Sequence, residues 1–168
     1  DSVTLLDSLF ILGTKCGFQL GIAHLNHLLR GDEASKDEDF VVNLSKEYGL
    51  PFWGQRIDVK EFAKVHSLSI EHAGREVRYD FLKRAAQSFG ANYIATAHTL
   101  DDQAETILLN LIRGSGIRGL QGIAERKSLG RGLTLLRPFF YFKKSELLNY
   151  AEHRNLKWRE DATNSMLV

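Results

Sequence analysis

Residues 92–113 read NYIATAHTLDDQAETILLNLIR, and they indicate the fold class more clearly than any other stretch of the chain. Residues 92–97 form a continuous apolar run of strand length, and residues 101–113 carry apolar side chains at helical spacing. We expect a buried strand that feeds directly into a helix. We expect that helix to pack through Ala104, Ile107, Leu108, Leu111 and Ile112.

Strands and helices alternate on both sides of this stretch. Short apolar runs predict strands at residues 18–25, 51–57 and 133–136. Apolar residues at helical spacing predict helices at residues 3–10, 61–65, 70–89 and 143–153. A further helix is marked by apolar residues at 40–48, and the acidic residues at 32–39 form its first turns. Such alternation is typical of βαβ units with right-handed crossovers. The predicted fold class is therefore α/β, a doubly wound parallel sheet with helices on both faces.

The composition fits one well-filled domain over residues 1–168, because 43% of the residues are hydrophobic and only two are proline. A charged fraction of 26% without low-complexity runs excludes disordered and fibrous proteins. The apolar runs are far shorter than the ~20 residues that cross a bilayer, so we expect a cytoplasmic protein with no membrane partner. Cys16 is the single cysteine, which agrees with a reducing compartment, and we expect it to fill the core at a helix end.

Charge is distributed unevenly along the chain, although the net charge is only +1. Residues 107–144 carry eight arginines and lysines against one acid, a local charge of +7 against −6 for the remainder. Such a segment suits a polyanionic partner. From the charge alone, a solvated surface is an equally good interpretation.

Ligands of parallel α/β sheets bind beyond the carboxyl ends of the strands, and this rule selects two polar segments. The first reads NHLLRGDE and follows the predicted strand that contains Ala23 and His24. Backbone groups at this strand end can form hydrogen bonds with the edge of an adenine, while Asn26 and Arg30 can reach ribose or phosphate. A metal site at His24 and His27 lacks a third ligand, so a nucleotide pocket is the better interpretation.

The second polar segment follows the apolar strand and holds His98, Asp101, Asp102 and Glu105. Asp102 and Glu105 are three residues apart on a helix, so both carboxylates can reach one Mg²⁺ ion or one ammonium group. There is a structural alternative, because Thr99 with Asp102 resembles a capping box and first-turn acids suit the helix dipole. We favour a functional cluster, since three acids and a histidine exceed what capping requires.

A glycine-rich, basic break, RGSGIRG, follows that helix at residues 113–119. Glycines let a backbone approach phosphate closely, and Arg113 and Arg118 can bind phosphate through two parallel hydrogen bonds. The motif is weak by itself, because a helix C-cap followed by a turn has the same composition. Its place inside the positive segment favours anion binding.

Five blocks, taken together and in this order, resemble the catalytic domain of the tRNA(Ile)-lysidine synthetase family, a member of the PP-loop ATP pyrophosphatases. The blocks are AHLNHLLRGDEASKDEDF, EHAGREVRYDFL, ATAHTLDDQAETILLNLIRGSGIRGL, LLRPFFYFKKSEL and WREDATN. The family's loop reads SGGxDS after a first strand, and this sequence opens with its last two residues, Asp1 and Ser2. The resemblance therefore implies that the first strand and the SGG of the loop, a nest for pyrophosphate, are missing here, as are tRNA-binding domains beyond residue 168.

The resemblance implies a two-step reaction that uses ATP and Mg²⁺. ATP adenylates the C2 oxygen of the first anticodon cytidine of isoleucine tRNA, and the amine of free L-lysine then displaces AMP. The implied catalytic residues are Asp1, Asp102 and Glu105, with Asp1 and Asp102 on the metal. The implied nucleotide contacts are Asp1, Ser2, Ala23, His24, Asn26, Arg30, His98, Arg113 and Arg118.

Two other functions stay open at this point. One is a different PP-loop tRNA-modifying enzyme of the thiolase type, against which the absence of a cysteine pair counts. The other is an adenine-nucleotide-binding domain without catalysis, which would need no clustered carboxylates. The oligomeric state is also open, with a homodimer as one option.

Overall fold

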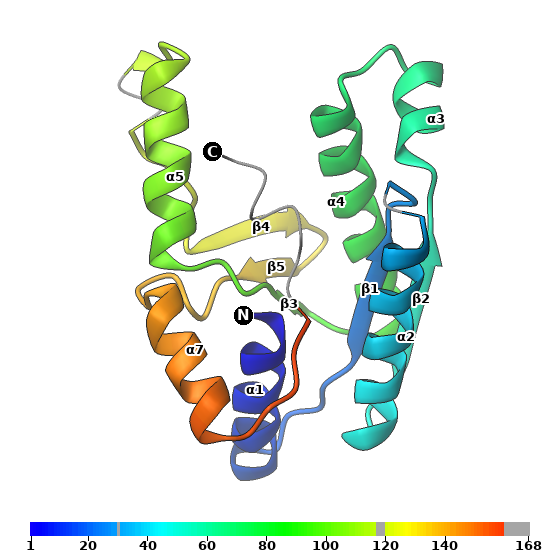
Figure 1. The fold of residues 1–168 in the computed structure, drawn as a ribbon, viewed down its shortest axis with the longest axis vertical. Helices are drawn as coiled ribbons and strands as arrows, with labels where there is room; N and C mark the ends of the chain where they lie inside the picture. Colours follow the sequence, from blue (N-terminus) through cyan, green and yellow to red (C-terminus); the bar gives the residue numbers. More distant parts are fainter. Residues whose placement is uncertain (30, 117–119, 160–168) are drawn as a thin grey trace. The chain divides into compact units, whose positions relative to one another are not determined.

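The computed structural model describes residues 1–29, 31–116 and 120–159 (Figure 1). The chain divides into two compact units. Unit 1 comprises Asp1–Cys16 with Ala95–Val168, and unit 2 comprises Gly17–Ile94. Each unit has a hydrophobic core of its own.

Unit 2 is built on two parallel strands, β1 (Ile22–Asn26) and β2 (Phe52–Arg56), which are joined by α2 (Asp32–Glu47). Their residues pair one to one along both strands, so the two strands end at the same edge. This order of strand, helix and parallel strand is the βαβ unit that the sequence predicts.

Two further helices, α3 (Val59–Val65) and α4 (Ile70–Phe89), complete unit 2. Asp58 begins α3, because its side chain accepts a hydrogen bond from the backbone N–H of Glu61. Gly90, in the left-handed conformation, ends α4. A buried cluster of the unit lies between these helices and consists of Val59, Ala63, Ala73 and Val77, with Leu25, Ile57, Phe62 and Leu68 packed against it.

The described residues of unit 1 include the helices α1 (Ser2–Cys16), α5 (Leu100–Ile112) and α7 (Lys144–His153). A second sheet has the strand order β3-β5-β4. Its strands β4 (Arg126–Gly130) and β5 (Leu133–Leu136) belong to unit 1, and the boundary between the units falls within β3 (Tyr93–Ala95). The strands β4 and β5 are antiparallel and form a hairpin.

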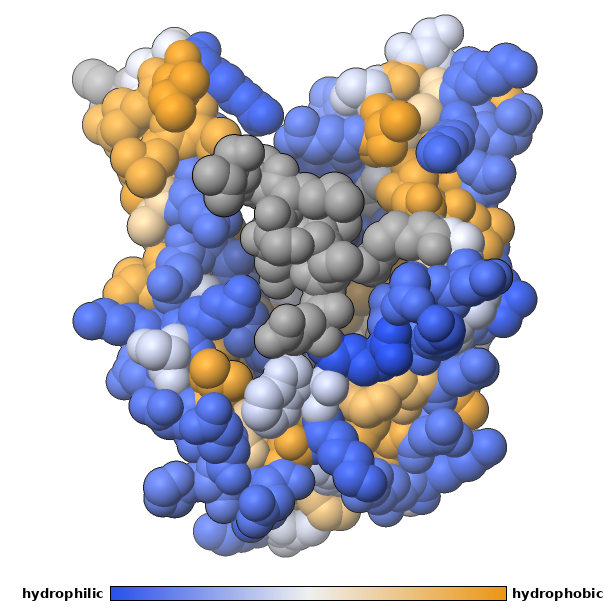
Figure 2. Space-filling view, in the orientation of Figure 1, coloured by the Kyte–Doolittle hydropathy of each residue, from blue (hydrophilic) through white to orange (hydrophobic). Residues whose placement is uncertain are grey.

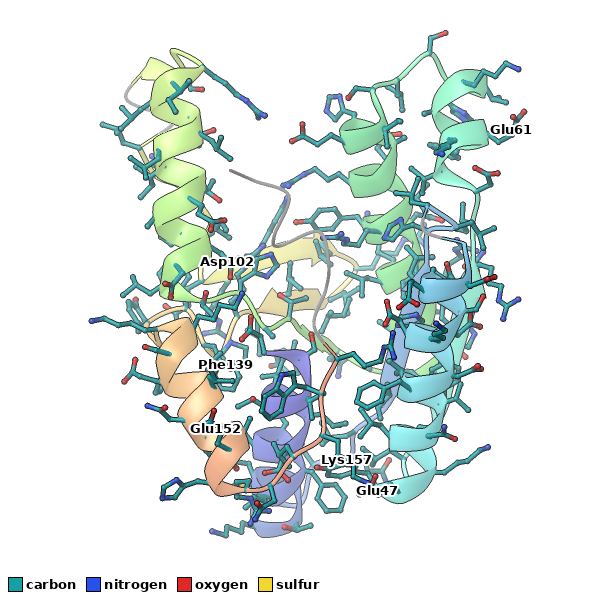
Figure 3. The ribbon with its side chains drawn as sticks, in the orientation of Figure 1. Glu47, Glu61, Asp102, Phe139, Glu152 and Lys157 are labelled. Atoms are coloured by element: carbon teal, nitrogen blue, oxygen red, sulfur yellow. The ribbon has the colours of Figure 1, made fainter. Side chains whose placement is uncertain are left out.

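The core of unit 1 joins α1 to α7. Leu5, Phe139 and Leu147 are buried in it, and Leu9 and Ala97 pack against them (Figure 3). A network around the buried carboxylate of Asp7 links the same two helices.

The Asp7 carboxylate accepts a hydrogen bond from the Tyr150 hydroxyl at 2.8 Å and bonds from the Arg154 guanidinium at 3.1 and 3.3 Å. Burial and the hydrogen bond to Asp7 raise the pKa of Tyr150. A charge buried at this depth is stable only when it is paired, so these contacts hold α7 at a set place against α1.

One face of α5 is apolar and exposed. None of its residues is buried, and Leu108, Leu109, Leu111 and Ile112 are between 48% and 82% exposed (Figure 2). The prediction that α5 packs through Leu108, Leu111 and Ile112 is therefore wrong for the described part of the chain. An amphipathic pattern identifies an apolar face, but it does not show what covers that face.

The predicted α/β class and its parallel strand pair are confirmed. The hairpin strand β4 was not predicted, because its sequence RKSLG is polar and largely exposed and its pairing comes from β5. The prediction that Cys16 fills the core is wrong, since this last residue of α1 is exposed. Within the described ranges, no helix is long and apolar enough to cross a membrane.

Candidate functional site

In unit 1 the N-terminal ends of α1, α5 and α7 come together (Figure 1). The backbone N–H of Lys144, the first residue of α7, donates to Oδ2 of Asp101 in the first turn of α5 at 2.7 Å. The N–H of Leu100 donates to the main-chain oxygen of Phe142 at 2.9 Å. The side chain of Lys144 is close enough to the backbone nitrogen of Asp1 to act on it electrostatically. Because each helix N-terminus carries partial positive charge, this meeting point favours an anion.

Asp102 lies in the first turn of α5, beside this meeting point (Figure 3). Its Oδ2 accepts hydrogen bonds from the backbone N–H of Thr99 at 2.7 Å and from the Thr99 hydroxyl at 2.8 Å. The Thr99 oxygen in turn accepts the N–H of Asp102 at 3.4 Å, so the capping box is present. Both bonds to the carboxylate use Oδ2. Oδ1 receives no hydrogen bond from a residue in the described ranges, which leaves it for a ligand.

Glu105 lies one turn along α5 from Asp102 and is exposed. Residues three apart on a helix share a face, so Glu105 can act on the same ligand as Asp102. His98 precedes the helix, and its Nδ1 is 2.9 Å from the Thr96 hydroxyl oxygen. Asp101, which the sequence groups with these acids, is instead engaged with the first N–H of α7.

Asp1 and Ser2 stand at the start of α1 and are both exposed. The main-chain oxygen of Asp1 accepts the N–H of Leu5 at 2.9 Å, which closes the first turn. Arg113 is the C-cap residue at the opposite end of α5. A rise of 1.5 Å per residue places its backbone about 16 Å along the helix from Asp102. The structure thus brings Asp1, Ser2 and Asp102 to one region of unit 1 and leaves the backbone of Arg113 away from it.

The predicted Mg²⁺ ligands, Asp1 and Asp102, both lie at this meeting point. In the part of the chain that the structure describes, no three His, Cys, Asp or Glu side chains are grouped as a complete metal site. Mg²⁺ commonly takes one or two protein carboxylates and completes its shell with water and substrate phosphates. The available Oδ1 of Asp102 fits that mode of binding.

In unit 2 the residue at the end of β1, Asn26, is 2% exposed. Its Nδ2 donates to the main-chain oxygen of Ala34 at 3.1 Å and to Oε2 of Glu38 at 3.0 Å. Its Oδ1 accepts the N–H of Leu28 at 2.9 Å. These bonds tie the strand end to α2 and occupy the Asn26 amide with protein groups.

Glu38 links this network to β2, because Nε of Arg56 donates to the same Oε2 at 2.8 Å. Burial opposes ionisation of Glu38, but the hydrogen bonds from Asn26 and Arg56 outweigh it, so the pKa of Glu38 is lowered. The pKa of His24 is lowered by burial, against the raising effect of Glu38 and Asp37. The His24 imidazole is therefore neutral near pH 7.

Sequence reasoning missed both members of this ion pair. The run of acids at residues 32–39 suits the dipole of the helix that it opens, which hid the separate contact of Glu38. The register of β1 and β2 places Asn26 opposite Arg56, and a parallel pairing of the two predicted strands is the signal that could have found it.

The other predicted nucleotide contacts are placed as follows. Ala23 is exposed and lies opposite Trp53 in the parallel pair. Arg30 and Arg118 lie outside the described residues. His24 and Asn26 belong to unit 2, whereas Asp1, Ser2 and His98 belong to unit 1. A nucleotide site shared by both groups stays a prediction.

Comparisons with known proteins show relatives across the whole chain. The model of the PP-loop domain family matches residues 1–167. A tRNA(Ile)-lysidine synthase of Dehalococcoides mccartyi is 43% identical over 98% of this chain, and one of Chlorobaculum tepidum is 38% identical over 98%. The chain spans 36% and 48% of these relatives, so about a third to a half of their length.

A solved structure shares the fold. The U34-tRNA thiolase NcsA from Methanococcus maripaludis, determined with its [4Fe-4S] cluster, aligns with a TM-score of 0.72 at 21% sequence identity. The alignment covers 95% of this chain and 55% of the thiolase. At this identity the likeness concerns the fold, which is the α/β class predicted from the sequence.

Proposed function

The chain belongs to the PP-loop family of ATP-binding domains, and from that premise we propose that its protein ligates lysine to a tRNA cytidine at the expense of ATP. The acceptor atom is C2 of the first anticodon cytidine of an isoleucine tRNA. The observation that carries the proposal is the available Oδ1 of Asp102 beside three helix N-termini. Similarity to tRNA(Ile)-lysidine synthases over nearly the whole chain supports it.

The proposed reaction has two steps, and each step forms one bond and breaks another. The C2 oxygen of the cytidine attacks the α-phosphorus of ATP, an O–P bond forms, and the bond to the leaving pyrophosphate breaks. The lysine amine then forms a bond to C2 while the C2–O bond breaks. AMP leaves with that oxygen, and the proton of the amine passes to a base. Each turnover consumes ATP and lysine and yields AMP, pyrophosphate and the modified tRNA.

Phosphate charge is stabilised by the meeting point of the helix N-termini. The partial positive charge of a helix N-terminus is fixed in place and needs no reorganisation during the reaction, which is why it lowers barriers effectively. Ser2 adds a hydroxyl at the start of α1, and Lys144 adds a positive charge nearby. We assign Arg113 and Arg118 to the nucleic acid, because the backbone of Arg113 lies at the far end of α5.

The three acids have separate roles in the proposal. Asp1 and Asp102 hold Mg²⁺, which neutralises phosphate charge when it is bound. Glu105 binds the ammonium group of lysine or accepts the proton that its amine releases, since it is exposed on the face that carries Asp102.

The strand-end residues contact the nucleotide. A neutral His24 and the backbone of Ala23 suit the uncharged adenine ring, and Arg30 suits a phosphate. His98 stands directly before α5, within the same segment as Asp102. We assign Asn26 an indirect role, because its amide is occupied in holding the end of β1.

The test uses the full-length protein, meaning this domain together with the remainder that the curated relatives carry. Incubation with ATP, lysine and unmodified isoleucine tRNA, followed by nucleoside mass spectrometry, should give a lysine adduct of cytidine. Omission of any one reactant should abolish it. A thiolated nucleoside would favour the thiolase alternative, and bound ATP that is never converted to AMP would favour a binding domain. The cytoplasmic location stays a prediction.

A further inference from the structure

We propose that Gln103 is a positioning residue that fixes the position of the basic β4–β5 hairpin relative to the carboxylate of Asp102. The inference rests on the proposed function, because it assigns the cations of the hairpin to the tRNA. Gln103 lies inside the HTLDDQAET segment, and neither the capping box nor the acidic site uses its side chain.

Gln103 follows Asp102 on α5, and neighbouring residues of a helix point about 100° apart. The two side chains therefore serve different parts of unit 1. Nε2 of Gln103 donates to the main-chain oxygen of Gln121 at 3.3 Å, and Oε1 accepts the N–H of Ile123 at 2.6 Å. The Gln103 amide thus both donates to and accepts from the same distant segment. A glutamine on a solvated helix face would instead bond to water.

Gly122 lies between those two partners, and its lack of a side chain leaves room for the Gln103 amide. Its φ is +57°, in the left-handed region that favours glycine. A Cβ at this position would lie 2.6 Å from both Nε2 and Oε1 of Gln103. Any side chain at residue 122 would therefore displace the amide.

The other end of the same segment is fixed to residues that follow β5. Arg137 is 5% exposed, and its guanidinium donates from Nη1 to the main-chain oxygen of Ala124. The N–H of Arg137 donates to the main-chain oxygen of Glu125 at 3.0 Å, and the Tyr141 hydroxyl donates to the Glu125 carboxylate at 3.2 Å. Residues 121–125 are thus held by α5 at one end and by Arg137 and Tyr141, which follow β5, at the other.

The basic hairpin begins at the next residue. Arg126 and Lys127 open β4, and Arg131 lies in the turn to β5; all three are exposed. Positive side chains on a hairpin suit the phosphates of a nucleic acid backbone. Because Gln103 joins the segment that leads into this hairpin to the helix that carries Asp102, it sets where bound RNA lies relative to the reactive carboxylate. A hairpin released from α5 would lose more conformational freedom on binding RNA.

Four variants of the full-length protein test this role. Gln103→Met keeps the size of the side chain and removes both hydrogen bonds. Gln103→Glu keeps the acceptor for Ile123 and removes the donor to Gln121. Gly122→Ala displaces the amide from the other side. Gln87→Met is the matched control, because Gln87 is an exposed glutamine on α4. The measurements are KM for tRNA, KM for ATP, kcat and the thermal midpoint.

We expect Gln103→Met and Gly122→Ala to raise KM for tRNA by about tenfold, the range that loss of one or two hydrogen bonds produces. KM for ATP and kcat should stay near the wild-type values. The KM for tRNA of Gln103→Glu should lie between those of the wild type and Gln103→Met, since one of the two hydrogen bonds survives. Adding Gln103→Met to a variant that lacks the charges of Arg126 and Lys127 should cause little further loss, because both changes act through the hairpin.

Two results would overturn the inference. In the first, Gln103→Met matches Gln87→Met in every measurement. In the second, KM for ATP, kcat and the thermal midpoint decline together with tRNA affinity, which indicates a general structural role. Failure of the proposed function is recognised separately, because the wild-type protein would then neither bind nor modify isoleucine tRNA.

Discussion

Replacing Asp102 by asparagine separates its capping role from its catalytic role. Oδ2 of the carboxylate holds Thr99 at 2.7 and 2.8 Å, whereas Oδ1 is available for a ligand. Asparagine keeps an oxygen acceptor for the cap and removes the negative charge. We expect the free energy of unfolding to fall by less than about 1 kcal/mol, within the usual cost of a weakened cap. Such a loss lowers the thermal midpoint by less than about 4 °C for a domain of this size.

Catalysis should respond far more strongly to Asp102→Asn. Loss of one preorganised electrostatic contact costs about 3 kcal/mol of barrier stabilisation, which corresponds to about a hundredfold in rate. The assay is single-turnover release of pyrophosphate from ATP in the presence of tRNA, with urea unfolding measured on the same preparation. The ratio of the two effects distinguishes a reactive carboxylate from a helix cap.

Thr99→Ala is the matched control, because it removes the hydroxyl of the cap and leaves the carboxylate in place. Thr99 is 1% exposed. This variant should lose about 1 kcal/mol of unfolding free energy and keep most of its adenylation rate. The reasoning is refuted if Asp102→Asn releases pyrophosphate at the wild-type rate, or if Thr99→Ala slows that release as much as Asp102→Asn does.

Three further predictions concern the tRNA surface, the strand-end network and the core. Alanine at both Arg113 and Arg118 should weaken tRNA binding more than ATP binding and reduce the slope of log affinity against log salt by about two; an unchanged slope would contradict a phosphate-binding role. The folded-state pKa of Glu38 is depressed, so its contribution to stability is present above its unfolded pKa of about 4.5 and is lost as the pH falls through the folded pKa. As the pH falls, urea midpoints of Glu38→Gln should therefore decline less steeply than those of the wild type. Parallel declines would show that ionised Glu38 does not stabilise the fold. Phe139→Ala should cost about 3–5 kcal/mol in urea unfolding, because Phe139 is 8% exposed within the core of unit 1; a cost below about 1 kcal/mol would place it outside that core.

The regular elements were predictable because hydrophobic periodicity is a local signal. The apolar stripe of α4 was read from its spacing, and its members Ala73, Val77, Phe81 and Ala85 are buried in the structure. The capping box at Thr99 and Asp102 was also readable, since its two residues are three apart in sequence. Signals of this kind depend on a few neighbouring residues only.

Contacts between distant segments were not predictable from spacing. The two bonds of Gln103 reach residues 18 and 20 positions away, and their only sequence sign is a glycine at position 122 that many loops would carry. The bond between Glu38 and Arg56 depends on the register of two strands, which a single sequence does not specify. The exposed face of α5 shows the converse, because an apolar stripe indicates burial only where a partner covers it.

The central claim is that ATP activates the C2 oxygen of the cytidine, and an isotope measurement tests it most directly. Isoleucine tRNA carrying oxygen-18 at C2 of the first anticodon cytidine is incubated with the full-length protein, ATP and lysine. The account predicts that the label leaves the nucleoside and appears in the phosphate of AMP, with one labelled AMP for each lysine adduct. Label retained in the tRNA while lysine is added, or hydrolysis of ATP to ADP in place of AMP and pyrophosphate, would contradict it.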